Sequence, residues 1–91
     1  MEGLNWYVYI LSCSDGTYYT GITNNLKKRI KTHNSGKGSK YTRSRLPVFF
    51  VYIKTSENRS TASKEEYRIK SLKKSEKIKL ISNNNYDLNS L

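Results

Sequence analysis

Two apolar stretches of the chain predict β-strands, one near the N-terminus and one in the middle. The first, Trp6-Tyr7-Val8-Tyr9-Ile10-Leu11, is rich in aromatic and β-branched residues, a composition typical of strands. Because it is apolar at nearly every position, we expect a central strand that is covered on both faces of its sheet. The second stretch, Val48-Phe49-Phe50-Val51-Tyr52-Ile53, follows Pro47 and is just as apolar.

A hairpin is expected directly after the first strand. Asp15-Gly16 favours a tight turn because these residues adopt the positive φ angles that such turns use. Thr17–Thr23 then returns as the second strand, which should bring Tyr9 and Tyr19 close together on one face. Gly21 within a strand predicts that a backbone or a ligand approaches closely there.

After the second strand, residues recur at the spacing of a helix. Asn24 or Asn25 is expected to cap a first helix, and Gly36 to end it. Residues 36–45 form a basic loop with room for one short helical turn. A second helix should begin near Ser60 or Thr61. A third helix, capped by Ser75, should present Ile78 and Ile81 on one face.

These elements predict one α+β domain over residues 1–82. Its expected order, ββαβαα, gives a small three-stranded antiparallel sheet flanked by helices. A chain of 91 residues has room for a single, thin core. The last residues, 83–91, contain three consecutive asparagines and no Lys or Arg, so we expect a poorly ordered tail.

Composition excludes several classes of protein. No apolar run approaches the ~20 residues of a membrane span, and the N-terminus lacks a signal-peptide pattern. The single cysteine, Cys13, cannot form an internal disulfide, which fits a reducing compartment. We therefore expect a cytoplasmic protein with no membrane partner.

The charge points to a polyanionic partner. The formal net charge is +10, and no Asp or Glu occurs between Gly16 and Ser56. A field of one sign attracts nucleic acid through counterion release. The alternatives are a solvated basic surface and an anionic membrane, although the latter usually requires an apolar stripe as well. The expected contacts to the phosphate backbone are Lys27, Lys28, Lys40, Arg43 and Arg45.

Few residues offer chemistry. Arg29 and His33 are four apart on the first predicted helix and share a face that points towards the tyrosine-bearing strands. Each also has an ordinary structural interpretation, since strand tyrosines usually pack and a lone histidine is usually buried with its partners. One histidine and one cysteine nearly exclude a structural zinc site.

Two adjacent acids interrupt the basic second helix. Glu65 and Glu66 lie among Lys64, Arg68 and Lys70. Either could simply form intrahelical ion pairs, for example Glu66 with Lys70 at i, i+4.

Together these residues resemble the GIY-YIG nucleases. Tyr7-Val8-Tyr9 and Tyr19-Thr20-Gly21, with nine residues between them, are similar to the two tripeptides that name the family. The resemblance extends from Tyr7 to Ile81 and is strongest to small bacterial proteins that consist of this domain alone. It matches the family's arginine to Arg29, its histidine or tyrosine to His33 and its glutamate to Glu66.

The resemblance implies a metal-dependent endonuclease that hydrolyses phosphodiester bonds of DNA, or alternatively RNA, with low sequence specificity. Glu66 would bind a single Mg²⁺ or Mn²⁺, and Arg29 would contact the phosphoryl oxygens. Tyr19 would orient or deprotonate the attacking water with Tyr9 as its hydrogen-bonding partner. His33 would act as a proton relay or a phosphate donor. A protein partner would supply any specificity.

The chain departs from the family pattern in two places. Ile22 occupies the position of a lysine that the repair-type members carry, and a late asparagine that holds substrate has no assigned counterpart among Asn83, Asn84 and Asn85. The alternative function is therefore a nucleic-acid-binding module with this fold and negligible turnover. A protein-interaction adaptor is a third hypothesis, but it gives the basic segment no role.

Overall fold

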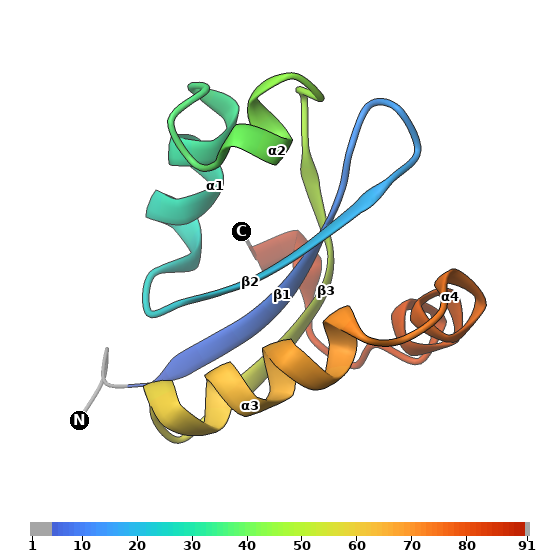
Figure 1. Ribbon diagram of the computed structural model, residues 1–91. Helices are drawn as coiled ribbons and strands as arrows, with labels where there is room; N and C mark the ends of the chain where they lie inside the picture. Colours follow the sequence, from blue (N-terminus) through green and yellow to red (C-terminus); the bar gives the residue numbers. More distant parts are fainter. Residues whose placement is uncertain (1–4, 91) are drawn as a thin grey trace.

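A three-stranded antiparallel sheet forms the centre of the molecule (Figure 1). The computed structural model describes residues 5–90 of the chain. Within them β1 (Trp6–Ser12) lies between β2 (Tyr18–Thr23) and β3 (Phe49–Ser56), in the order β2-β1-β3. The predicted α+β class and the central position of the first strand are confirmed.

The helices cover both faces of the sheet. On one face lie α1 (Leu26–Asn34) and α2 (Lys40–Arg43), and on the other α3 (Arg59–Lys70) and α4 (Lys74–Ser82). Alternate residues of β1 enter two separate apolar clusters, Tyr9 and Leu11 in one and Val8 and Ile10 in the other. This two-sided burial explains why the first strand is apolar at successive positions.

Side-chain caps set most of the helix ends. Asn25 Oδ1 accepts a hydrogen bond from Lys28 N at 3.1 Å and begins α1 as predicted. Asn58 caps α3 in the same way, so α3 starts slightly earlier than Ser60. The expectation that Ser75 caps the last helix is wrong. The Glu76 carboxylate accepts from Lys73 N at 2.9 Å, so α4 already starts at Lys74.

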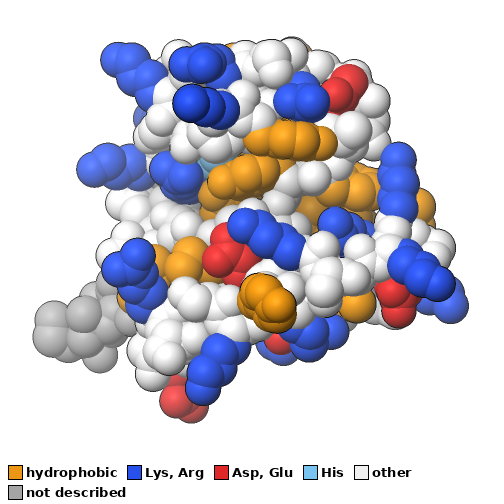
Figure 2. Space-filling model, in the orientation of Figure 1, with side chains coloured by type: hydrophobic (Ala, Val, Ile, Leu, Met, Phe, Trp, Pro, Cys, Tyr) orange, Lys and Arg blue, Asp and Glu red, His pale blue; other side chains and the backbone are white. Residues whose placement is uncertain are grey.

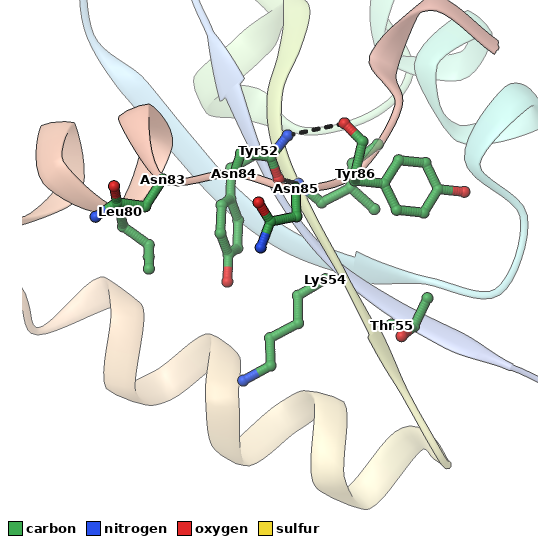
Figure 3. Close-up of a pocket in the computed structure, with 9 residues that line it drawn as sticks. Tyr52, Lys54, Thr55, Leu80, Asn83, Asn84, Asn85 and Tyr86 are labelled. Atoms are coloured by element: carbon green, nitrogen blue, oxygen red, sulfur yellow. Dashed lines mark hydrogen bonds between the residues drawn. The ribbon is translucent and has the colours of Figure 1, made fainter.

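The chain after α4 lies against the sheet, where the sequence predicted a poorly ordered tail. Asn84 Oδ1 accepts a hydrogen bond from Ile53 N at 3.2 Å, and Asn84 Nδ2 donates to the Tyr86 carbonyl at 3.1 Å. Tyr86 and Leu88 pack against the apolar cluster that contains Tyr9. Figure 3 shows Asn84 and Tyr86 beside β3, lining a surface hollow. Leu91 lies outside the described residues.

Edge-strand chemistry explains this packing. β3 is an edge strand, so one row of its backbone groups lacks a strand partner. The Asn84 amide pairs one of these groups, and Tyr86 meets the Tyr7 ring edge-on at 6.4 Å between centroids.

Among the described residues no helix is long and apolar enough to cross a membrane.

Candidate active site

A buried tyrosine on the central strand organises the candidate site. Tyr9 is fully buried and pairs in register with Gly21 of β2. A Cβ at Gly21 would lie 2.5 Å from Tyr9 Oη, so the tyrosine ring occupies the space that any other residue's side chain would fill. The predicted close approach at Gly21 is therefore made by the Tyr9 side chain.

The Tyr9 hydroxyl joins the two candidate residues of α1. Arg29 Nε donates to Tyr9 Oη at 3.2 Å, and His33 Nε2 lies 2.9 Å from the same oxygen. Arg29 Nη2 also donates to the Gly38 carbonyl at 3.2 Å. The helical spacing predicted this convergence, since residues four apart on a helix project from the same face.

His33 continues the network towards α2. It is fully buried, and its Nδ1 lies 2.9 Å from Thr42 Oγ1, which is also buried. Thr42 Oγ1 lies 3.4 Å from the Ser39 carbonyl, which can accept its hydrogen. Tyr9 Oη already accepts from Arg29, so we assign its own hydrogen to His33 Nε2 and the ring hydrogen of His33 to Nδ1.

Burial sets the protonation of both groups. Burial, helped by the charge of Arg29, lowers the pKa of His33 to about 4. Burial also raises the pKa of Tyr9 to about 12, although the Arg29 hydrogen bond opposes it. At neutral pH the imidazole is therefore neutral and the phenol keeps its proton. These two side chains hold Arg29 in place, and neither is placed to take a proton from bulk water.

Tyr19 is the partly exposed member of the tyrosine pair. Its ring meets His33 edge-on at 5.3 Å and lies 6.5 Å from the Tyr9 ring, between centroids. The expected proximity of the two tyrosines is thus present, but the Tyr9 hydroxyl bonds to Arg29 and His33 rather than to Tyr19. The Tyr19 ring also stacks on Tyr41, with centroids 6.0 Å apart.

The two adjacent glutamates of α3 differ in their partners. Glu65 accepts two hydrogen bonds from Arg68, at 2.9 and 2.7 Å, and pairs with Lys54 at 3.4 Å. The Arg68 hydrogen bonds are the main reason why the pKa of Glu65 falls to about 2. Glu66 forms the i, i+4 ion pair with Lys70 at 3.1 Å, and 23% of its side chain is exposed.

Glu66 lies within electrostatic reach of the tyrosine network. Its charge is one of the contributions that raise the pKa of Tyr9. Residues 5–90 contain no group of three or more His, Cys, Asp or Glu side chains that could hold a metal ion. Within these residues a metal ion would therefore be held by fewer than three such side chains.

The predicted phosphate contacts fall into two groups. Lys27 and Lys28 on α1 and Lys40 and Arg43 on α2 are exposed. Arg45 is engaged instead, because its Nε donates to Asp15 Oδ2 at 2.9 Å and its guanidinium lies 3.9 Å from the Tyr41 ring centroid.

A hollow beside Tyr19 adds residues that the sequence analysis missed. It has a volume of about 210 Å³ and is lined by Tyr18, Tyr19, Thr20, Tyr41, Lys70 and Lys77. Figure 2 shows hydrophobic side chains across the middle of this face, with Lys and Arg side chains above and below them. The fold places Tyr41 on Tyr19 and Thr42 on His33.

Comparison with known proteins identifies the family. Residues 5–79 match the GIY-YIG catalytic domain. A UPF0213 protein of Clostridium perfringens is 57% identical over 76 residues, which cover 84% of this chain and 82% of the relative. A UPF0213 protein of Desulfotalea psychrophila is 56% identical over 77 residues, covering 84% and 70% respectively.

Solved structures agree with this match. The solution structure of the UPF0213 protein BH0048 from Bacillus halodurans is 46% identical and has a TM-score of 0.56, covering 86% of this chain and 83% of that one. The solution structure of EF2693 from E. faecalis is 35% identical with a TM-score of 0.57, covering 91% and 92%. The chain therefore belongs to the GIY-YIG catalytic domain family, as its tyrosine, arginine, histidine and glutamate positions indicated.

Proposed function

We propose that this protein is a metal-dependent endonuclease that hydrolyses phosphodiester bonds in nucleic acid, DNA being favoured, with low intrinsic sequence specificity. One observation carries the proposal. Arg29 is held by the buried Tyr9 hydroxyl at 3.2 Å, in a network that also fixes His33 beside the partly exposed Tyr19. A fixed cation beside a partly exposed phenol suits hydrolysis of a phosphodiester, where negative charge accumulates on the phosphoryl oxygens.

Glu66 is chemically suited to the metal that the family implies. Its carboxylate is partly exposed and, among residues 5–90, forms an ion pair with Lys70 alone, whereas Glu65 pairs with both Lys54 and Arg68. Mg²⁺ keeps several of its waters and needs only one or two protein carboxylates together with substrate phosphate. Bound at Glu66, Mg²⁺ or Mn²⁺ would polarise a phosphate oxygen as a Lewis acid.

The side chains of the protein would hold the phosphate and orient the attacking water. Arg29 donates from Nε to Tyr9 and from Nη2 to Gly38, and its guanidinium also interacts with Tyr19. With five N–H donors, it can still donate to phosphoryl oxygens. Tyr19 is the group that would orient the attacking water. Tyr9 and His33 hold Arg29 and Tyr19 in position as neutral groups. Lys27, Lys28, Lys40 and Arg43 would contact the phosphate backbone without reading its sequence.

The test is a cleavage assay with a matched pair of variants. Labelled single-stranded, duplex and branched DNA and RNA are incubated with Mg²⁺ or Mn²⁺ and with wild type, Glu66→Gln or Glu65→Gln protein. We expect metal-dependent cutting by the wild type and a loss of at least about a hundredfold in Glu66→Gln, because one missing electrostatic group costs this much in comparable sites. Nucleic-acid binding should be nearly unchanged in Glu66→Gln.

Glu65→Gln is the control, because it removes the same charge one residue away and should retain cleavage. Equal cleavage by Glu66→Gln and wild type would reject the metal assignment. Binding without cutting by the wild type on every substrate would instead support a binding module with negligible turnover. Ile22 would then be the first position to examine, since repair-type relatives have a lysine there.

A further inference from the structure

Arg45 ties the β1–β2 turn to the segment that follows α2. Its Nε donates to Asp15 Oδ2 at 2.9 Å, and its Nη1 donates to the Tyr41 carbonyl at 2.8 Å. The backbone is tied as well, because Ser14 N donates to the Arg45 carbonyl at 3.0 Å. These contacts fix the plane of the guanidinium, and only 31% of the Arg45 side chain is exposed.

The fixed guanidinium forms one layer of a stack that ends at Tyr19. Arg45 Cζ lies 3.9 Å from the Tyr41 ring centroid. The Tyr41 ring in turn stacks on Tyr19, with centroids 6.0 Å apart and planes inclined by 27°. Contacts therefore run without a break from Asp15 in the turn, through Arg45 and Tyr41, to the tyrosine beside His33.

We infer that Asp15 and Arg45 are positioning residues that act through Tyr41 on Tyr19, and that Arg45 is not a contact for nucleic acid. This inference rests on the proposed function. Tyr19 belongs to an edge strand and is partly exposed, so its ring depends on the contact with Tyr41 for part of its support. A water-orienting group displaced by about 1 Å can lose about a hundredfold in rate, which makes this support important.

The chemistry of arginine distinguishes this role from phosphate binding. A planar guanidinium can stack on a ring and donate from several nitrogens at once, whereas a lysine ammonium cannot do both. A phosphate contact tolerates lysine, because a point charge is sufficient there. Arg45→Lys therefore keeps the charge and removes the stack.

The experiment measures kcat, KM and the salt dependence of binding for Arg45→Lys and Asp15→Asn. We expect kcat to fall by about tenfold or more in both variants, with KM and the salt slope unchanged. Arg68→Lys is the control for the first variant, since Arg68 also pairs with a carboxylate but lies on α3 outside the stack. Glu57→Gln, at an exposed acid, controls for the charge lost in Asp15→Asn.

The opposite assignment makes different predictions. If Arg45 contacts phosphate, Arg45→Lys should retain wild-type kcat. Asp15→Asn should then bind more tightly than Glu57→Gln, because it frees a cation. Either result overturns the inference. Thermal unfolding of each variant shows whether a loss of activity comes from unfolding. If Asp15→Asn unfolds, Arg45→Lys is the milder substitution and still tests the inference.

A second measurement needs no cleavage. NMR ring-proton shifts of Tyr41 and Tyr19 in the free protein should move in Arg45→Lys and Asp15→Asn, and stay in place in the two controls. Unmoved shifts would overturn the inference even if activity fell. A wild type that does not cleave would defeat the proposed function, whereas a cleaving wild type with equally active variants would defeat the inference alone.

Discussion

At the scale of single residues, the site depends on one glycine being opposite one tyrosine. Gly21 leaves the space that the Tyr9 ring fills, and Tyr9 holds both Arg29 and His33. The substitution Gly21→Ala should therefore push the Tyr9 ring aside and destabilise the fold by about 1–3 kcal/mol, the usual cost of overpacking. Cleavage should fall further than stability alone explains, which urea unfolding and the cleavage assay together would measure.

Gly16→Ala is a suitable comparison for this variant. Gly16 has a φ of +82° in the β1–β2 turn, and a Cβ there would meet no atom within 4 Å. The substitution should cost about 1 kcal/mol through backbone strain and leave the network around Tyr9 intact. If both variants lose cleavage in the same proportion to stability, Gly21 has no special role in the site.

His33 should make stability depend on pH. Its pKa is lowered from its ordinary value of 6.5 to about 4 in the folded protein, so the unfolded chain binds the proton more readily. The stabilisation is therefore complete above about pH 6.5 and is lost as pH falls towards 4, by up to about 3 kcal/mol. Urea unfolding between pH 7.5 and pH 4.5 should show this fall.

The His33→Gln variant separates this contribution from that of the carboxylates. It should be less stable at pH 7 but nearly independent of pH over the same range. Glu65 and Asp15 have lowered pKa values, so their contributions are lost only as pH falls below the ordinary carboxyl range. A wild-type slope that survives in His33→Gln would mean that another group titrates.

Helix and strand periodicity predicted which candidate-site residues lie close together along regular elements. It did not predict the residues whose position depends on tertiary contacts. Tyr9 meets Arg29 and His33 because hairpin pairing and helical spacing fix their directions. A buried histidine needs partners for both ring nitrogens, but which side chain supplies the second is decided by the loop path. Thr42 and Tyr41 were therefore not identified from the sequence.

At the scale of secondary structure, local signals gave most of the element boundaries. These signals affect only the few residues next to them, so their effects were predictable. Examples are the Asn25 cap, the Asp15-Gly16 turn and the apolar first strand. The start of α4 was mispredicted because Glu76, rather than a serine, satisfies the free backbone group at Lys73. The contacts of the C-terminal segment with β3 were not predicted, since they depend on the position of an edge strand that is distant in the sequence.

The three consecutive asparagines offer a direct test of this segment. Asn84→Ala should remove the acceptor of the Ile53 N–H and destabilise the protein by about 1–2 kcal/mol. Asn83→Ala and Asn85→Ala, both at exposed positions, should change stability by less than about 0.5 kcal/mol. Urea unfolding of the three variants measures the difference.

The same variants test whether a late asparagine holds substrate. Asn84 bonds to β3, while Tyr19 lies on β2 at the other edge of the sheet. Asn84→Ala should therefore reduce cleavage only as far as it reduces the folded fraction. A large increase in KM for any of the three variants, at full stability, would assign that asparagine to substrate binding.

At the scale of the whole molecule, positive charge lies on both sides of the candidate site. Exposed cations of α1 and α2 lie on one side of Tyr19, and Lys70 and Lys77 line the hollow on the other. The net charge of +10 would attract any polyanion, so affinity alone does not locate the binding surface. The dependence of affinity on salt concentration, compared between variants, locates this surface, because each phosphate contact releases counterions.

The double variant Lys40→Gln/Arg43→Gln should therefore lower the slope of log K against log salt by about 2 for duplex DNA, since each lost contact removes about 0.9. The double variant Lys64→Gln/Lys79→Gln removes the same charge from exposed positions of α3 and α4 and should change the slope much less. Fluorescence titrations between about 50 and 200 mM salt measure both slopes. Equal changes would mean that the protein binds nucleic acid through its overall charge, whereas a loss confined to the first variant would place the phosphate backbone along α2, on the same side of the sheet as Arg29 and Tyr19.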